Sequence, residues 1–195
     1  MDQARIQDLR DRYLKWAPAT APEDLVFIDE SGAHIAMTRE TAWAPVGETP
    51  RDAVPRNRGT VITMIAALSV AGLHSMMTIE GGTSAEVFVT WVEKVLVPDL
   101  WKGAIVVMDN LGAHKDVRVR ALIEAAGAKV AYLPPYSPDL NPIELAWTKV
   151  KRWLRTARRR TREALDEALD NIMHLVTRDD AKGWFRHCGY RARPE

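Results

Sequence analysis

Short apolar runs and longer stretches with helical periodicity alternate along this chain. Three runs of mainly apolar residues are typical of strands buried on both faces, at 25–28, 104–108 and 129–133. Strand-like residues over 60–70 and 73–80, joined by Ala71 and Gly72, predict a β-hairpin. Apolar residues recur at helical spacing in the other predicted elements, which cover 1–16, 83–97, 116–126, a long stretch from 143, and 161–176.

The order of these elements predicts how they are arranged. Strands separated by helices form a mainly parallel sheet with helices on both faces, and here an antiparallel hairpin is attached to it. We therefore expect an α/β fold with a mixed sheet. Residues 34–43 alternate loosely and predict a short outer strand or hairpin, whereas the three prolines in 45–58 predict an exposed loop. Trp91 and Trp101 are large residues that we expect in the core.

Length and composition are those of a single globular domain. The chain has 195 residues, of which 47% are hydrophobic, enough for a sizeable core. A net charge of +1 argues against uniform binding of polyanions. Cys188 is the single cysteine, which excludes an internal disulfide and fits a reducing compartment. The charged residues in 1–15 are unlike a signal peptide, and no apolar run has membrane-spanning length, so we expect a soluble cytoplasmic protein.

Two aspartates follow predicted buried strands. Asp29 comes directly after the first apolar run, and Asp109 directly after the run at 104–108. Ligands of parallel sheets bind beyond the carboxyl ends of the strands, so both carboxylates can point into one region. The alternative is that Asp29 and Glu30 only form the turn that returns the chain to water.

A third acid, Glu144, stands at the start of the long helix. Asn141 is a good N-cap, and Glu144 can close a capping box on its amide. The alternative is a metal ligand, because clustered carboxylates raise one another's pKa unless a cation compensates them. Mg²⁺ is the natural compensator, and a pair of such ions stabilises the attacking and leaving oxygens in phosphodiester chemistry. Scattered histidines and a lone cysteine disfavour zinc.

The long helix also carries a cationic face. Glu144, Thr148, Lys151 and Arg155 fall on one arc beside the apolar arc, so an acid heads a stripe of cations. A solvated helical face is the ordinary interpretation. We prefer binding of the DNA phosphate backbone, because the stripe begins at a candidate metal site. The candidate DNA contacts are Lys151, Arg152, Arg155, Arg158 and Arg159, together with Arg51, Arg56 and Arg58 from the basic loop.

Three motifs together resemble a known family. They are Phe27-Ile28-Asp29-Glu30-Ser31, Met108-Asp109-Asn110 followed by His114-Lys115, and Pro138-Asp139-Leu140-Asn141-Pro142-Ile143-Glu144. In this order they resemble the transposases of the mariner superfamily, and more closely its bacterial insertion-sequence branch. The 34 residues between Asp109 and Glu144 are the spacing typical of that branch. The resemblance extends over about 25–190.

The resemblance implies a ribonuclease H-like three-layer fold and a reaction. Asp29, Asp109 and Glu144 would be an Asp-Asp-Glu triad that binds two Mg²⁺ or Mn²⁺ ions. The enzyme would hydrolyse the phosphodiester at a transposon end, and the freed 3′-hydroxyl would attack target DNA, at a TA dinucleotide as in the family. Asn110 and His114 would have supporting roles. Glu30 also matches, but neighbouring strand residues point to opposite faces, so we do not expect it to be a ligand.

The resemblance also implies domain bounds and partners. Residues 1–23 would be an N-terminal helix and linker, 24–190 the catalytic domain and 191–195 a tail. Members of the family carry helix-turn-helix DNA-binding modules upstream, so such a segment is expected upstream or in a separate reading frame. The chain would bind transposon ends and target DNA as a homodimer on paired ends, in the nucleoid-associated cytoplasm of a bacterium, without a membrane partner. The alternatives are a host-recruited nuclease of the same fold and an inactive copy that only binds DNA.

Overall fold

A five-stranded mixed sheet forms the centre of the computed structural model, which describes residues 3–191. The strands lie in the order β3-β2-β1-β4-β5, and their bounds are Leu25–Ala33 (β1), Ile62–Ser69 (β2), Gly72–Glu80 (β3), Ile105–Met108 (β4) and Lys129–Tyr132 (β5). β1 is antiparallel to β2 and parallel to β4, which is parallel to β5. β2 and β3 form the predicted antiparallel hairpin. The mixed sheet that the order of elements predicted is therefore confirmed.

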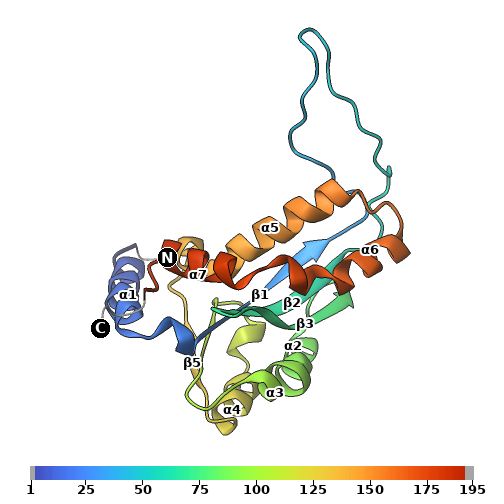
Figure 1. Ribbon diagram of the computed structural model, residues 1–195. Helices are drawn as coiled ribbons and strands as arrows, with labels where there is room; N and C mark the ends of the chain where they lie inside the picture. The colour runs from blue at the N-terminus through green and yellow to red at the C-terminus, as the bar shows by residue number, and fades with distance from the viewer. Residues whose placement is uncertain (1–2, 192–195) are drawn as a thin grey trace.

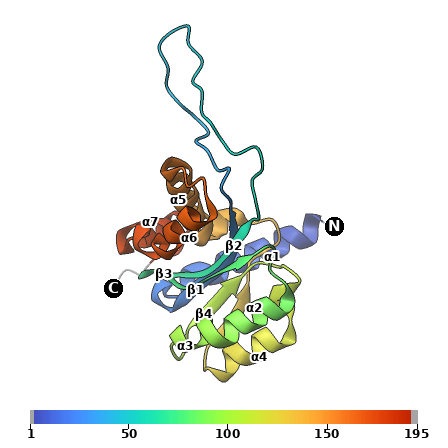
Figure 2. The ribbon, with the colours of Figure 1, turned by 90° about the vertical axis from the view of Figure 1, so that its right-hand side faces the viewer.

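Helices cover both faces of the sheet (Figures 1 and 2). One face carries α5 (Pro142–Ala157), α6 (Arg162–Asp170) and α7 (Arg178–His187), with α1 (Gln3–Trp16) packed beside α7. The other face carries α2 (Ala85–Trp91), a π-helical turn (Val92–Leu96), α3 (Val97–Asp99) and α4 (Val117–Ala125). Among the helices described in residues 3–191, none is long and apolar enough to cross a membrane.

Side chains of β1 divide between two cores. Phe27 packs edge-on against Phe185 of α7, with ring centroids 5.3 Å apart, in the core under α5 and α7. Ile28 belongs to the second core, under α2 and α4, where Phe88 is also buried. Because neighbouring strand residues point to opposite faces, a strand covered on both faces is apolar throughout. This is why the run at 25–28 predicted a buried strand correctly.

Local signals account for several helix ends. Ser84, the N-cap residue of α2, accepts a hydrogen bond from the Val87 amide at 3.3 Å. Gly127 follows α4 with a φ of +80°, a conformation that glycine adopts without a Cβ clash. Trp91 is fully buried as predicted, but Trp101 is 37% exposed. The prediction for Trp101 was wrong because this residue lies in the surface turn between α3 and β4, outside both helical layers.

Residues 34–61, here called the protruding segment, link β1 to β2 and extend away from the body of the protein (Figures 1 and 2). The segment contains no strand, so the prediction of a strand or hairpin at 34–43 was wrong. β1 and β2 pair as far as Ala33 opposite Ile62, and no third strand continues the ladder there. The predicted exposed loop at 45–58 is confirmed. Trp43, close to it, is fully exposed.

The C-terminal region contains one more helix than the sequence predicted. Thr161 is the N-cap residue of α6, and a 3₁₀ turn (Ile172–Leu175) follows α6 instead of the one continuous helix predicted over 161–176. α7 then begins with a capping box between Thr177 and Asp180. Its inner face was missed because it contributes few apolar side chains to the core, chiefly Phe185. Of the predicted tail, residues 192–195 lie outside the described residues.

Candidate active site

The register of the sheet brings Asp29 and Asp109 to the same level. β1 and β4 pair in parallel up to Phe27 opposite Val107. Two residues beyond this pair, the same register places Asp29 beside Asp109. β1 continues to Ala33, so Asp29 lies inside a strand, and its interpretation as part of a turn was wrong. Because alternate residues share a face, Asp29 follows Phe27 to the α5 side of the sheet.

Glu144 joins the two aspartates from the first turn of α5. Asn141 is the N-cap residue, but its side chain makes no hydrogen bond to the helix, so the capping box does not form. Glu144 is exposed, and together with Asp29 and Asp109 it lines one cavity of about 560 Å³. We call this cavity the triad cavity. One acid from within β1, one that follows β4 and one from the start of α5 therefore line the same cavity, although Asp29 and Glu144 are 115 positions apart in the sequence.

The environment of the triad cavity disfavours the charged form of Asp29. Burial, followed by the charge of Glu144, raises the pKa of the Asp29 carboxyl to about 7. The charges of Glu30 and Asp109 act in the same direction, while a backbone hydrogen bond opposes them. Three ionised carboxylates are thus unfavourable together unless a cation compensates them.

Asp109 has the opposite environment. Burial would raise its pKa, but hydrogen bonds from His114 and the Leu111 amide, together with the charges of His114 and Lys115, hold it below the ordinary value. His114 Nδ1 lies 2.6 Å from Asp109 Oδ1, and the Leu111 amide donates to the same oxygen at 2.9 Å. One carboxylate oxygen is therefore fixed, and Oδ2 is left for other partners.

His114 connects Asp109 to Glu30. The imidazole is fully buried, its Nε2 lies 3.1 Å from Glu30 Oε2, and its ring packs on Phe88 with centroids 4.4 Å apart. Burial lowers the pKa of His114, but the two carboxylates outweigh this and raise it to about 9. The residue is therefore a cation at neutral pH. Glu30 points away from the α5 side, as strand alternation predicted, yet its link to Asp109 through His114 was not predicted.

Asn110, Lys115 and Tyr136 are among the other residues that line the triad cavity. The Asn110 side-chain amide donates to the Leu133 carbonyl at 2.6 Å, which ties the end of β4 to the end of β5. Lys115 is exposed and lowers the pKa of Asp109 by its charge. Tyr136 is 79% exposed at the cavity with a φ of +56°, a strained conformation for a residue with a side chain. Lys115 and Tyr136 were not singled out from the sequence, although both lie inside or beside the recognised motifs.

The triad cavity fits a divalent cation by its donor chemistry. Hard cations such as Mg²⁺ and Mn²⁺ prefer carboxylate oxygens, and Asp29, Asp109 and Glu144 supply three carboxylates with no thiol among them. Within residues 3–191, no three acidic, histidine or cysteine side chains stand close enough to hold an ion as they are placed. The three carboxylates would therefore have to turn toward one another to share it.

The candidate DNA contacts divide into paired and unpaired cations. Arg155 forms an ion pair with Glu40 at 2.8 Å, and Arg158 with Asp52 at 3.4 Å, so both cations bind the protruding segment. Lys151 and Arg152 on α5 make no ion pair with a described residue. The same is true of Arg51, Arg56 and Arg58, which lie exposed on the protruding segment, and of Arg159.

Several solved structures of Mos1 transposase have a similar fold. A Mos1 mariner paired end complex with Mn matches with a TM-score of 0.75 at 17% identity, over 96% of this chain and 59% of that one. The Mos1 strand transfer complex gives 0.73 at 16%, with the same coverage. The Mos1 transposase catalytic domain with raltegravir and Mg gives 0.68 at 15%, over 96% of this chain and 90% of that one. These matches show that the fold is ribonuclease H-like.

The extent of these matches is informative. The chain spans 59% of the length of the longer Mos1 chains but nearly all of the catalytic domain. No curated protein matches the sequence. A family profile described as DDE superfamily endonuclease matches residues 24–166, which include Asp29, Asp109 and Glu144. Because this match covers most of the chain, the protein belongs to the DDE superfamily endonucleases.

Proposed function

We propose that this chain is the catalytic domain of a cut-and-paste DNA transposase, from the bacterial insertion-sequence branch of the mariner superfamily. The observation that carries this proposal is that Asp29, Asp109 and Glu144 line one cavity, in the Asp-Asp-Glu order of the motifs. Membership of the DDE superfamily endonucleases and the shared fold with Mos1 transposase support it. The catalytic domain would extend over 24–190.

We assign the chemistry to named side chains. Asp29, Asp109 and Glu144 would hold two Mg²⁺ or Mn²⁺ ions, which when bound stabilise charge on the attacking and leaving oxygens of a phosphodiester. Mos1 structures with Mn and with Mg support this choice of metals. His114 and the Leu111 amide hold one oxygen of Asp109 in place, and Asn110 fixes the adjacent loop. These supporting groups keep the carboxylate oriented without contacting substrate.

The substrate would be a transposon end and then target DNA. After hydrolysis at the end, the freed 3′-hydroxyl would attack the target strand, at a TA dinucleotide. Lys151 and Arg152, which have no ion-pair partner in the described chain, are better placed than the paired Arg155 to bind phosphate groups. Arg159, Arg51, Arg56 and Arg58 would add contacts.

The working assembly would be a homodimer on paired ends. The protruding segment carries Trp43 and Val46, both fully exposed, and such apolar side chains are ordinary contacts between subunits. Mos1 paired end and strand transfer complexes support DNA-bound assembly. A helix-turn-helix segment, upstream or on a separate chain, would recognise the terminal repeats, and the protein would act in the nucleoid-associated cytoplasm of a bacterium.

A nicking assay tests the proposal. The substrate is a plasmid that carries the inverted repeats flanking the reading frame, incubated with the full chain and Mn²⁺. Wild-type protein should nick at the repeat ends, and Asp109→Asn should abolish nicking. Glu93→Gln is the matched control, because Glu93 is an acid paired with Lys94 at 2.9 Å in the π-helical turn, away from the triad cavity. Undiminished nicking by Asp109→Asn would contradict the assignment of the triad.

Strand transfer separates the transposase from its alternatives. Pre-cut ends with a free 3′-hydroxyl should be joined to a target plasmid by the wild-type protein. A host-recruited nuclease would nick without joining, and an inactive copy would bind DNA without either reaction. Either outcome replaces the proposed function with the corresponding alternative.

A further inference from the structure

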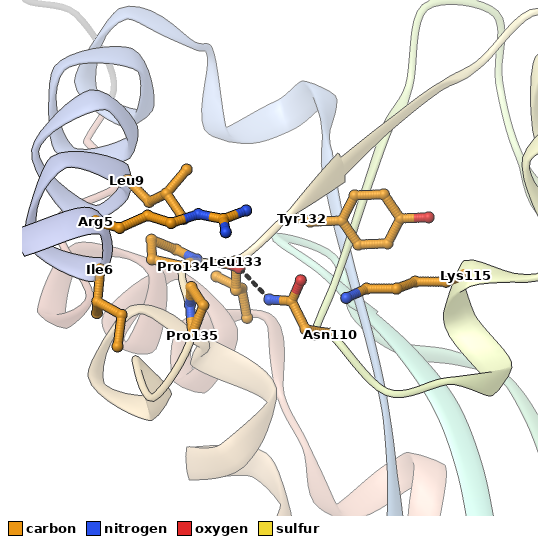
Figure 3. Close-up of a pocket in the computed structure, with 9 residues that line it drawn as sticks. All are labelled: Arg5, Ile6, Leu9, Asn110, Lys115, Tyr132, Leu133, Pro134 and Pro135. Atoms are coloured by element: carbon orange, nitrogen blue, oxygen red, sulfur yellow. Dashed lines mark hydrogen bonds between the residues drawn. The ribbon is translucent and has the colours of Figure 1, made fainter. Parts of the chain in front are cut away.

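A second cavity, of about 440 Å³, lies directly beside the triad cavity (Figure 3). One wall is α1, and the other is formed by the ends of β4 and β5. Asn110, Lys115, Leu133, Pro134 and Pro135 line both cavities. The two hollows are therefore neighbouring parts of one surface depression, and the hydrogen bond from Asn110 to the Leu133 carbonyl fixes the wall between them.

The charge of this second cavity is opposite to that of the triad cavity. Arg5 reaches in from α1 and Lys115 from the loop after β4, from opposite sides (Figure 3). Neither side chain forms an ion pair or a hydrogen bond with a described residue, and no acid is among the lining residues. The charge of Lys115 also acts on Asp109 of the triad cavity. Two cations without an ion-pair partner, on a lining that contains no acid, attract an anion, and a phosphate group is the anion that the neighbouring site handles.

Apart from Asn110 and Tyr132, the remaining lining is apolar. Ile6 and Leu9 project from α1, and Leu9 is 38% exposed although it is a large aliphatic residue. Pro134, next to Leu133, also belongs to this apolar part of the lining (Figure 3). A ligand that matches both parts of this lining carries a phosphate and a flat apolar group. A nucleotide has this combination, and the cavity volume lies within the range of about 300–1,000 Å³ typical of small-ligand sites.

We propose that this cavity binds one unpaired nucleotide, adjacent on the same DNA strand to the phosphodiester that is cleaved in the triad cavity. Arg5 and Lys115 contact its phosphate, and its base packs between Leu9 and Pro134. A base inside a duplex has both faces covered by its stacked neighbours, so the nucleotide has to leave the stack before its base can pack in this depression. The inference rests on the proposed function, because it takes the scissile strand to lie in the triad cavity. If the nucleotide is bound in this way, the duplex is kept unpaired next to the phosphodiester that is cleaved.

Binding of single-stranded DNA tests the cations. The probe is a short fluorescein-labelled oligothymidylate, titrated by fluorescence anisotropy with the full chain in Ca²⁺ over a series of salt concentrations. Arg5→Ala and Lys115→Ala should each weaken binding about three- to tenfold and reduce the slope of log affinity against log salt by about 0.7. Arg5→Lys should restore most of the slope. Arg12→Ala, on the same helix but paired with Asp8 at 2.9 Å and outside the cavity, should bind like the wild type.

A double-mutant cycle tests the base. Leu9→Ser should weaken binding of the oligothymidylate, whereas an abasic strand of equal length should bind Leu9→Ser and wild-type protein alike. A merely structural role of Leu9 would weaken both probes equally. Circular dichroism melts of each variant confirm that α1 is retained.

The outcomes separate this inference from the proposed function. Binding that depends on Arg5 and Lys115, without any nicking that depends on Asp109, supports the cavity and removes the transposase proposal. Nicking that depends on Asp109, with Arg5→Ala and Lys115→Ala binding and cleaving like the wild type, overturns the nucleotide site alone. Wild-type protein that fails to bind the strand, or equal losses in Arg12→Ala, also overturns it.

Discussion

The triad cavity and the C-terminal end of α5 are both rich in charge, but only one of them is balanced. In the triad cavity, Asp29 and Glu144 form no ion pair with a described residue, and the pKa of Asp29 is raised to about 7. At the end of α5, Arg155 and Arg158 are compensated by acids of the protruding segment. Arg160 beside them donates to backbone carbonyls of the same segment.

The difference distinguishes charged residues that stabilise the fold from charged residues that are suited to bind a ligand. Balanced cations hold the base of the protruding segment against α5, which is a structural task. Acids without a counter-charge cost stability, and such groups persist in a cleft where a ligand supplies the missing charge.

The largest effect should follow from removing one unbalanced acid. Glu144→Gln should reduce Mn²⁺-dependent nicking by about 10²–10³-fold, because a group that stabilises the transition-state charge is lost. Its free energy of unfolding should equal or exceed that of the wild type, since the repulsion with Asp29 disappears. Nicking rates and urea denaturation measure the two quantities. Arg155→Gln is the matched comparison, and an equally large loss of nicking in that variant would break the distinction.

A smaller loss should follow from removing the partner of His114. Glu30→Gln leaves the buried imidazolium with one carboxylate instead of two, so Asp109 is held less firmly. Partners that orient metal ligands typically contribute about 10- to 100-fold to activity or metal affinity, and we expect nicking to fall within that range. The free energy of unfolding at pH 7 should fall by about 1–3 kcal/mol.

Metal titration separates orientation from general destabilisation in Glu30→Gln. If Glu30 acts through His114 and Asp109, the Mn²⁺ concentration for half-maximal nicking should rise. A variant that is less stable but has an unchanged Mn²⁺ requirement would show that the Glu30–His114 contact only stabilises the fold.

The pKa of Asp29 predicts a pH dependence of stability. Folding raises this pKa from near 4 to about 7, so the folded state holds the proton more tightly than the unfolded state. The stability that this tighter proton binding contributes is present at low pH and is lost as pH rises through 7. Asp29→Asn removes the charge, so the variant should be more stable than the wild type by about 1–3 kcal/mol at pH 8 and equal to it at pH 4. For a chain of this size, each kcal/mol corresponds to about 2–4 °C in melting temperature.

Thermal melts at pH 4 to 8 measure this effect, and Mn²⁺ sharpens it. At pH 8 Mn²⁺ should raise the melting temperature of the wild type and have little effect on Asp29→Asn. The range stops at pH 8 to stay below the pKa of His114, which is about 9. This pKa is raised because Glu30 and Asp109 stabilise the charged imidazole, and the stability that these contacts contribute is lost as pH rises through about 9. Equal melting curves for Asp29→Asn and wild type at pH 8 would contradict the repulsion inferred for the triad cavity.

The sequence predicted features that depend on near neighbours, and it missed those that depend on distant ones. The apolar runs before Asp29 and before Asp109 are visible in four and five residues, and parallel pairing of the two strands then brings the two acids together. The contact between Glu30 and His114 joins positions 84 apart, through a side chain on the face opposite to the triad. No local pattern records that distance. Asn141 shows the converse, since an ideal capping sequence forms no capping box.

The cations of α5 show again that the sequence does not reveal which distant residue a side chain contacts. A helical stripe that includes Lys151 and Arg155 is readable from the sequence, but their partners are not. Glu40, which pairs with Arg155, stands in a segment for which the sequence predicted a strand or hairpin. Pattern alone therefore treated paired and unpaired cations as equivalent candidates for DNA binding.

The smallest effects should distinguish these cations from each other. Arg155→Gln breaks an exposed ion pair with Glu40, so the free energy of unfolding should fall by less than about 1 kcal/mol. Lys151→Gln should leave stability unchanged but reduce the salt dependence of duplex DNA binding by about one unit of slope, because an unpaired cation is free to contact phosphate. Urea denaturation and anisotropy over a salt series measure both variants side by side. A reduced slope in Arg155→Gln as large as that in Lys151→Gln would mean that the pair with Glu40 opens when DNA binds, and that balance in the free protein does not predict which cations the DNA uses.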